Sequence, residues 1–310
     1  MFGAALYLSN QHPQSHWIMR AALPAFLAEA VFYPASIFEA TRAWFRRISS
    51  RRTQGALLWI SALAPYLIFS LAAGMFERNA FYLLAVLSGV LAFWYVYTPR
   101  RIAYDLGFLV IAAAPIVERV FLRIYQSPGD HVRVDILGHL MWIRVGVLAL
   151  LVLREWDPGP LSFWPRASEW KLGLIYYAAV LVPIIFIATA LHDVHFAPMH
   201  GPWWRVGAIG IGTFFGMLWV VALAEELFFR GVIERALYDY WRSPVLAVFG
   251  SAVLFGCAHL WFHEFPDWRR ACVATVLGVA CGFAYLQTGS VRAPMVTHAF
   301  VVATWRVLFK

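Results

Sequence analysis

Charged residues are scarce in this chain of 310 residues. Only 14% of its residues are Asp, Glu, Lys or Arg, while 62% are hydrophobic, whereas soluble domains have about 25% charged and about 45 to 50% apolar residues. This composition excludes an ordinary soluble protein. Apolar runs near the length of roughly 20 residues that a membrane-crossing helix needs recur along the chain, so we expect an all-α, polytopic transmembrane helix bundle with about eight to ten membrane helices.

Cysteine is also rare, and a signal peptide is not recognisable. Cys257, Cys272 and Cys281 form no CxxC pair and lie in predicted membrane helices, so neither a disulfide framework nor a zinc cluster is predicted. We expect all three to be small, buried apolar residues. The first twenty residues carry several polar side chains where a signal peptide needs an apolar core, so we expect the first membrane segment to be retained.

The net charge of +8 is spread over short loops instead of forming one basic tract. Arginines cluster in the loops at 42–52 and 98–101, which is typical of the cytoplasmic loops of membrane proteins. This pattern predicts membrane lipids with anionic headgroups as partners and gives no support to nucleic-acid binding. Short loops and many Ala and Arg residues favour a multi-pass protein of a bacterial inner (cell) membrane.

The segment 154–171 is rich in Pro, Trp and charge, which is typical of a loop at the level of the lipid headgroups. We therefore predict an N-terminal transmembrane helical extension over 1–165 and a second domain over 166–310 that carries the motifs described below. Within the extension, Arg144 can face the bundle interior. Neither Arg144 nor Glu29 is assigned to an active site.

Two adjacent acids, Glu225 and Glu226, stand with Arg230 in an otherwise apolar stretch. We predict a helix over 222–238 for this stretch, separate from a helix over 204–221. Ionisable groups in hydrocarbon are costly, so the cluster indicates a functional site. Glu226 and Arg230 are four residues apart and can form an ion pair, whereas Glu225 points about 100° away. One acid can therefore be structural while its neighbour reacts. The alternative is a polar network that merely closes a helix end.

Two histidines can join these acids. His259, four residues after Phe255, is as far from the polar turn near residue 242 as Glu225 is, so an antiparallel hairpin brings both to the same depth, roughly 25 Å along the helices. His298 follows the predicted start of another helix. With straight, full spans it would lie about 15 Å away from His259 in depth. Convergence therefore requires a short, tilted or re-entrant helix.

In this order the motifs resemble those of the CAAX protease and bacteriocin-processing family, the glutamate-type intramembrane proteases. The family's EExxxR motif corresponds to 225–230, its FxxxH motif to 255–259, and its last histidine to His298. The resemblance covers about 205–308. Three ordered motifs are far more specific than any one of them.

The resemblance implies an intramembrane endopeptidase that cleaves a membrane-anchored protein or peptide, possibly near a C-terminal lipidated or sorting segment, without a cofactor. It assigns Glu225 as the general base, His259 as a partner of the attacking water or of the base, and His298 as the group that stabilises the oxyanion. Glu226 would position Arg230 and the helix.

One position departs from the family pattern. Val302 stands four residues after His298, where the family commonly has an asparagine that helps to hold the oxyanion. Trp305 lies on the same helical face and has an indole N–H that could replace this donor. Losing one oxyanion donor costs about 100- to 1,000-fold in rate. The alternative function is therefore a catalytically weakened or inactive member that acts as a membrane immunity or scaffold protein.

A zinc protease is a further alternative, because two histidines and two glutamates could coordinate a metal ion. The HExxH motif is missing, since His263 and Glu264 are not followed by a second histidine at the required spacing. The histidines and the aspartate at 192–200 could also bind a metal ion, but a solvated loop is the simpler interpretation.

Overall fold

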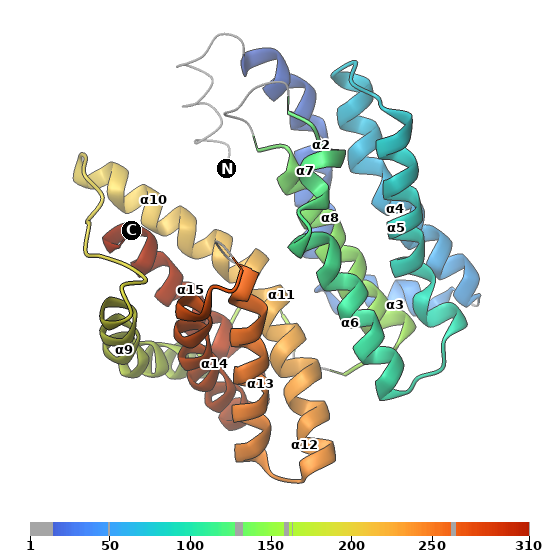
Figure 1. Ribbon diagram of the computed structural model, residues 1–310. Helices are drawn as coiled ribbons and strands as arrows, with labels where there is room; N and C mark the ends of the chain where they lie inside the picture. The colour runs from blue at the N-terminus through green and yellow to red at the C-terminus, as the bar shows by residue number, and fades with distance from the viewer. Residues whose placement is uncertain are drawn as a thin grey trace. The chain divides into compact units, whose positions relative to one another are not determined.

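The computed structural model describes residues 15–48, 50–127, 133–157, 161–162, 164–261 and 265–309, and most of them are helical (Figure 1). The predicted polytopic helix bundle is confirmed. Within these ranges, seven helices are long and apolar enough to cross a membrane, or up to eight if one bent pair is counted as a single span. The protein is therefore an integral, multi-pass membrane protein.

The chain forms two compact units, Met1–Trp156 and Asp157–Lys310. The helical segments of the first unit are α2 (Ser15–Ala35), α3 (Glu39–Arg47), α4 (Arg51–Ala72), α5 (Arg78–Tyr97), α6 (Ile102–Val117), α7 (Val120–Ile124), α8 (Asp135–Leu148) and the π-helical η1 (Ala149–Leu153). Helices α2 and α3 are the bent pair, at 86° to each other.

An ion pair lies inside the first unit. The Nε of Arg144 on α8 donates to Oε1 of Glu29 on α2 at 2.7 Å, and the same guanidinium also donates to the hydroxyl and the carbonyl of Ser61 on α4. Both charged side chains are buried. Arg144 faces the interior as predicted, but its pairing with Glu29, 115 residues away, was not predicted.

The second unit contains the predicted motifs. Its helical segments are α9 (Ala167–Ala190), α10 (Trp203–Gly216), η2 (Met217–Val221), α11 (Ala222–Glu226), η3 (Leu227–Glu234), α12 (Arg235–Trp241), α13 (Pro244–Ala258), η4 (His259–Trp261), α14 (Trp268–Thr288) and α15 (Arg292–Leu308). Of these, η2 and η3 are π-helical and η4 is a 3₁₀ turn.

The segments from α10 to α12 form one continuous helix of 39 residues, Trp203–Trp241. The prediction of two helices, over 204–221 and 222–238, is therefore wrong. The expected boundary falls between Val221 and Ala222, where neither Gly nor Pro stops a helix. At 1.5 Å per residue the helix is about 58 Å long, and it changes direction near α11 (Figure 1), where the π-helical turns lie.

Helices α13 and α14 pack closely through small residues. A Cβ on Gly256 would lie 2.0 Å from Oγ1 of Thr275, and one on Gly278 would lie 3.0 Å from Cα of Ala252. Small residues let membrane helices approach in this way. The close packing holds α13, and therefore Phe255, firmly against the rest of the unit.

The turn between α14 and α15 is buried. Gly289 ends α14 with a φ of +60°, a conformation that glycine adopts readily, and the next residues, Ser290, Val291 and Arg292, are all buried. The charge of Arg292 is matched by Glu169 of α9, whose Oε1 lies 2.7 Å from Nη2. Helix α15 therefore begins inside the unit and not at its surface.

The prediction for the cysteines is correct only in part. All three are free thiols, but Cys281 is buried while Cys257 and Cys272 are exposed. The packed faces of α13 and α14 are occupied by glycines and alanines, so these two cysteines are left on the outer faces of their helices. A thiol behaves as a small apolar group, so this position is compatible with contact with lipid.

Candidate active site

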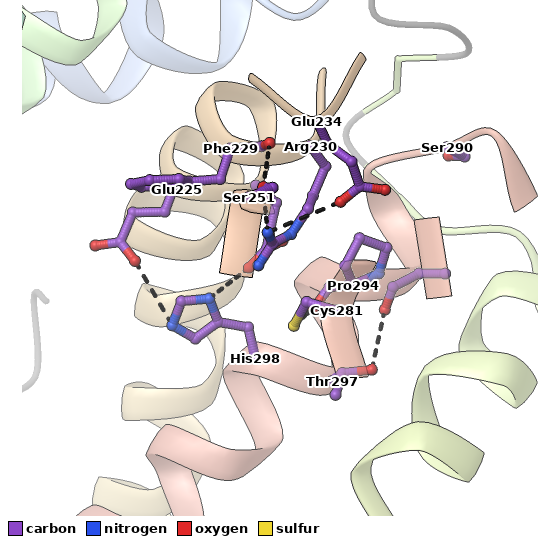
Figure 2. Close-up of polar contacts among 12 residues, drawn as sticks. Glu225, Phe229, Arg230, Glu234, Ser251, Cys281, Ser290, Pro294, Thr297 and His298 are labelled. Atoms are coloured by element: carbon purple, nitrogen blue, oxygen red, sulfur yellow. Dashed lines mark hydrogen bonds and ion pairs between the residues drawn. The ribbon is translucent and has the colours of Figure 1, made fainter. Parts of the chain in front are cut away.

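Glu226 lies at the centre of a buried polar cluster, and Figure 2 shows two of its members, Arg230 and His298. Its Oε2 accepts a hydrogen bond from Nε of Arg230 at 2.9 Å, and its Oε1 lies 2.8 Å from Nδ1 of His298. All three side chains are buried. The predicted ion pair between Glu226 and Arg230 is confirmed, and it is an interior pair, not a surface network at a helix end.

Arg230 is held by side chains of two other elements, α11 and α13. Besides Glu226, its Nη1 donates to Oγ of Ser251 on α13 at 2.8 Å, and this hydroxyl donates in turn to the carbonyl of Phe229 at 2.9 Å. The guanidinium also lies 5.4 Å from the ring centroid of Phe255, which is a cation–π distance. Ser251 was not predicted, because a lone serine in an apolar helix gives no signal of its partner.

His298 stands between the two adjacent acids. A carboxylate only accepts hydrogen bonds, so Nδ1 of His298 must carry the hydrogen that it shares with Glu226. The other ring nitrogen, Nε2, lies 3.8 Å from Oε2 of Glu225. The wide separation from His259 that straight, full spans would give does not occur, because the rings of His259 and His298 lie 4.7 and 5.8 Å from the ring of Phe255 and α15 packs against α10, η2 and α11.

Glu225 differs from Glu226 in its surroundings. Its side chain is 32% exposed, yet its Oε2 is buried and has no hydrogen-bond partner among the described residues. The two oxygens of Glu226, in contrast, are both engaged. Of the two acids, Glu225 therefore retains a buried acceptor for a further molecule.

Phe255 connects His259 to the cluster. Its buried ring lies 5.8 Å from the ring of His298 and 4.7 Å from the ring of His259, measured between centroids. Nδ1 of His259 lies 2.9 Å from the carbonyl of Phe255, and because a carbonyl only accepts, this nitrogen carries the hydrogen. His259 is half-buried at the C-terminal end of α13.

A third acid extends the cluster. Glu234 lies one turn beyond Arg230, is only 4% exposed, and its Oε2 is 3.9 Å from Nη1 of Arg230. Figure 2 shows its carboxylate on the side of Arg230 away from His298. Glu234 is four residues after Arg230, the same spacing that predicts the pair of Glu226 and Arg230. The proximity of Glu234 to Arg230 could therefore have been predicted from the sequence.

Val302 replaces the asparagine of the family pattern, and Trp305 is the donor predicted to take its place. Both lie beyond His298 on α15. Val302 is half-buried. The indole ring of Trp305 lies 5.5 Å from the guanidinium of Arg270 and 5.3 Å from the ring of Phe309. These contacts hold Trp305 toward the end of α15, away from the turn that carries His298.

Metal-binding arrangements were also considered. Within the ranges that the structure describes, no three His, Cys, Asp or Glu side chains are grouped so that they could hold a metal ion. In the loop 192–200, Asp193 forms an ion pair with Arg270 at 3.4 Å. His263 and Glu264 lie outside the described residues.

The family comparison agrees with this geometry. Residues 208–304 match the family model of the type II CAAX prenyl endopeptidases, Rce1-like. This segment is similar to that family. The resemblance inferred from the three motifs is thereby confirmed, and the matched range contains every residue of the cluster from Glu225 to His298. No curated protein and no solved structure matches the chain.

Proposed function

We propose that the second unit is an intramembrane endopeptidase in which Glu225 activates a water molecule to cleave a peptide bond. The Rce1-like match supports the class of activity. One observation carries the assignment of the base: Oε2 of Glu225 is a buried acceptor without a hydrogen-bond partner among the described residues, 3.8 Å from Nε2 of His298. A carboxylate and an imidazole at this distance can share one water molecule.

The proposed reaction starts with attack of the water oxygen on the scissile carbonyl carbon, while Glu225 takes one proton from the water. The resulting oxyanion needs a donor. His298 can serve when it is an imidazolium, because Nδ1 then donates to Glu226 while the N–H at Nε2 is directed toward the reacting atoms. Collapse of the intermediate breaks the C–N bond, and the proton held by Glu225 passes to the leaving nitrogen.

His259 and the ion pair have supporting roles in this scheme. The ring of His259 donates through Nδ1 to the carbonyl of Phe255 and packs against the ring of Phe255, so it borders the cluster on the side of Phe255. Arg230 keeps Glu226 ionised beside His298, and Glu226 fixes the orientation of the imidazole. Such a carboxylate–histidine pair resembles the way a buried aspartate orients the histidine of a serine protease.

We infer that the substrate is a membrane-anchored protein or peptide, cleaved near a C-terminal lipidated or sorting segment, and that the enzyme works in a bacterial inner membrane in contact with anionic lipids. We also propose that the N-terminal extension helps to receive such a substrate. The composition of the chain and the arginine-rich loops support the location.

The test is cleavage of a membrane-anchored reporter peptide by protein reconstituted in liposomes. E225Q should abolish cleavage and leave the thermal unfolding temperature near that of the wild type, because a glutamine keeps the shape but cannot take a proton. E77Q, which changes an acid in the other unit, should cleave normally. Wild-type activity in E225Q would refute the scheme.

Val302 favours one competing function, a non-catalytic scaffold or immunity protein. Under that hypothesis the wild-type protein binds membrane-anchored peptides but releases no product. A wild-type protein that is stably folded and inactive toward reporters with lipidated and with transmembrane C-termini would support the competing function.

A further inference from the structure

A cavity lies in the second unit, at the end of the bundle where α12 turns into α13. Its volume is about 210 Å³. It is bounded by one acid, one arginine, two tyrosines and small or apolar residues. These residues are Glu234, Arg235, Tyr238, Pro244, Ala247, Tyr285, Leu286 and Gly289.

Glu234 supplies a buried carboxylate to this cavity. The side chain is 4% exposed, and its Oε2 has no hydrogen-bond partner among the described residues. The Nη1 of Arg230, at 3.9 Å, is beyond hydrogen-bond distance. Gly282 on α14 leaves room for this oxygen, because a Cβ at that position would lie 3.0 Å from it. A buried acceptor is costly unless a donor reaches it, and because Glu234 lines the cavity, a donor bound there can pair with its carboxylate.

The other side chains of the lining favour a cation beside a phosphate. Tyr238 and Tyr285 present aromatic rings, which attract ammonium groups. Arg235 lines the same cavity and donates through Nη1 to the carbonyl of Asp157, which leaves further guanidinium donors for a phosphate. The lining therefore complements a zwitterion with its ammonium at Glu234 and its phosphate at Arg235.

The cavity also lies at the depth where headgroups are found. It is bounded by residues at the end of α12, the start of α13 and the end of α14. Next to it Tyr240 and Trp241 are exposed, and exposed Tyr and Trp residues are enriched at the interface between the bilayer and water. A lipid headgroup can therefore reach the cavity from the surrounding membrane.

We propose that this cavity binds the headgroup of a phosphoethanolamine lipid. The primary ammonium donates hydrogen bonds to Glu234, which a choline headgroup cannot do because its nitrogen carries no hydrogen. The bound ammonium competes with Arg230 for the Glu234 carboxylate. Occupation of the cavity therefore also changes the electrostatic environment of the ion pair between Arg230 and Glu226.

The test measures thermal unfolding of the purified full-length protein in detergent, with short-chain phosphatidylethanolamine or phosphatidylcholine of the same chain length added. A ligand that binds the folded state raises the unfolding temperature in a saturable way. We expect saturable stabilisation by the ethanolamine lipid, with little effect of the choline lipid. E234Q should weaken the apparent affinity at least tenfold, and E77Q should leave it unchanged.

A second variant covers the case in which E234Q does not fold, and a free headgroup tests whether the lipid itself is the ligand. Y238A removes part of the cavity wall without touching the buried charges, and it should also weaken the response if E234Q does not fold. Equal stabilisation by both lipids, or an undiminished response in E234Q or Y238A, would overturn the proposal. So would stabilisation by free phosphoethanolamine alone with none by the lipid. The readout is binding, so its failure leaves the proposed protease activity untouched.

Discussion

Replacing Arg230 with methionine tests whether the cluster around Glu226 is held together by buried charge. The guanidinium is fully buried, donates to Glu226 and Ser251, and lies over the ring of Phe255. Methionine fills a similar volume but removes the guanidinium that pairs with Glu226 and lies nearest to Glu234. Removing one partner of a buried ion pair typically costs about 3 to 5 kcal/mol, and we expect the free energy of unfolding of R230M to fall by this amount.

The matched control is R100M, which breaks the pair between Arg100 and Glu155, whose side chains are 38% and 53% exposed. Exposed pairs contribute less than about 1 kcal/mol. Both variants are measured by reversible unfolding in mixed micelles. The double variant E226Q/R230M should recover part of the loss, because it removes the uncompensated charge of Glu226 as well. If R230M loses no more stability than R100M, the argument from buried charge is wrong.

Three other changes have defined outcomes. R144M in the first unit should lower the free energy of unfolding by about 3 to 5 kcal/mol, since it leaves Glu29 buried and unpaired, and the same micelle titration measures it. G256A should cost about 1 to 3 kcal/mol because its Cβ overlaps α14, whereas G207A, with nothing within 4 Å, should unfold at nearly the wild-type temperature. V302N should raise the rate of peptide cleavage by up to about 100-fold if it supplies the missing oxyanion donor; an unchanged rate would show that this position does not face the reacting atoms.

Local patterns in the sequence were enough to find the acids and their arginine. The four-residue spacing of Glu226 and Arg230 fixes a shared helix face wherever the helix lies, so this pair could be predicted without tertiary information. The same spacing would have identified Glu234. Ser251 could not be found in this way, because its role depends on how closely α13 approaches the helix of Arg230.

The position of His298 beside the acids could not be predicted from local sequence patterns either. Treating the residues around Ser290 as a surface turn places this histidine too far from the acids. In the structure the turn is buried, and that is tolerable because Arg292 finds Glu169, 123 residues away in the chain. A contact between residues so distant in sequence leaves no periodic signal, so the sequence could not show that the separation of about 15 Å expected for straight, full spans does not apply.

The adjacent acids illustrate how the membrane environment divides roles between chemically identical groups. Both oxygens of Glu226 are bound, one by Arg230 and one by His298, and the side chain is fully buried. Glu225, turned about 100° away on the same helix, keeps a buried oxygen without a hydrogen-bond partner among the described residues. A carboxylate in a membrane interior is tolerated where it is paired or functional. Because pairing accounts for Glu226, we propose the reactive role for Glu225, and the same reasoning applied to Glu234 leads to the proposed headgroup cavity.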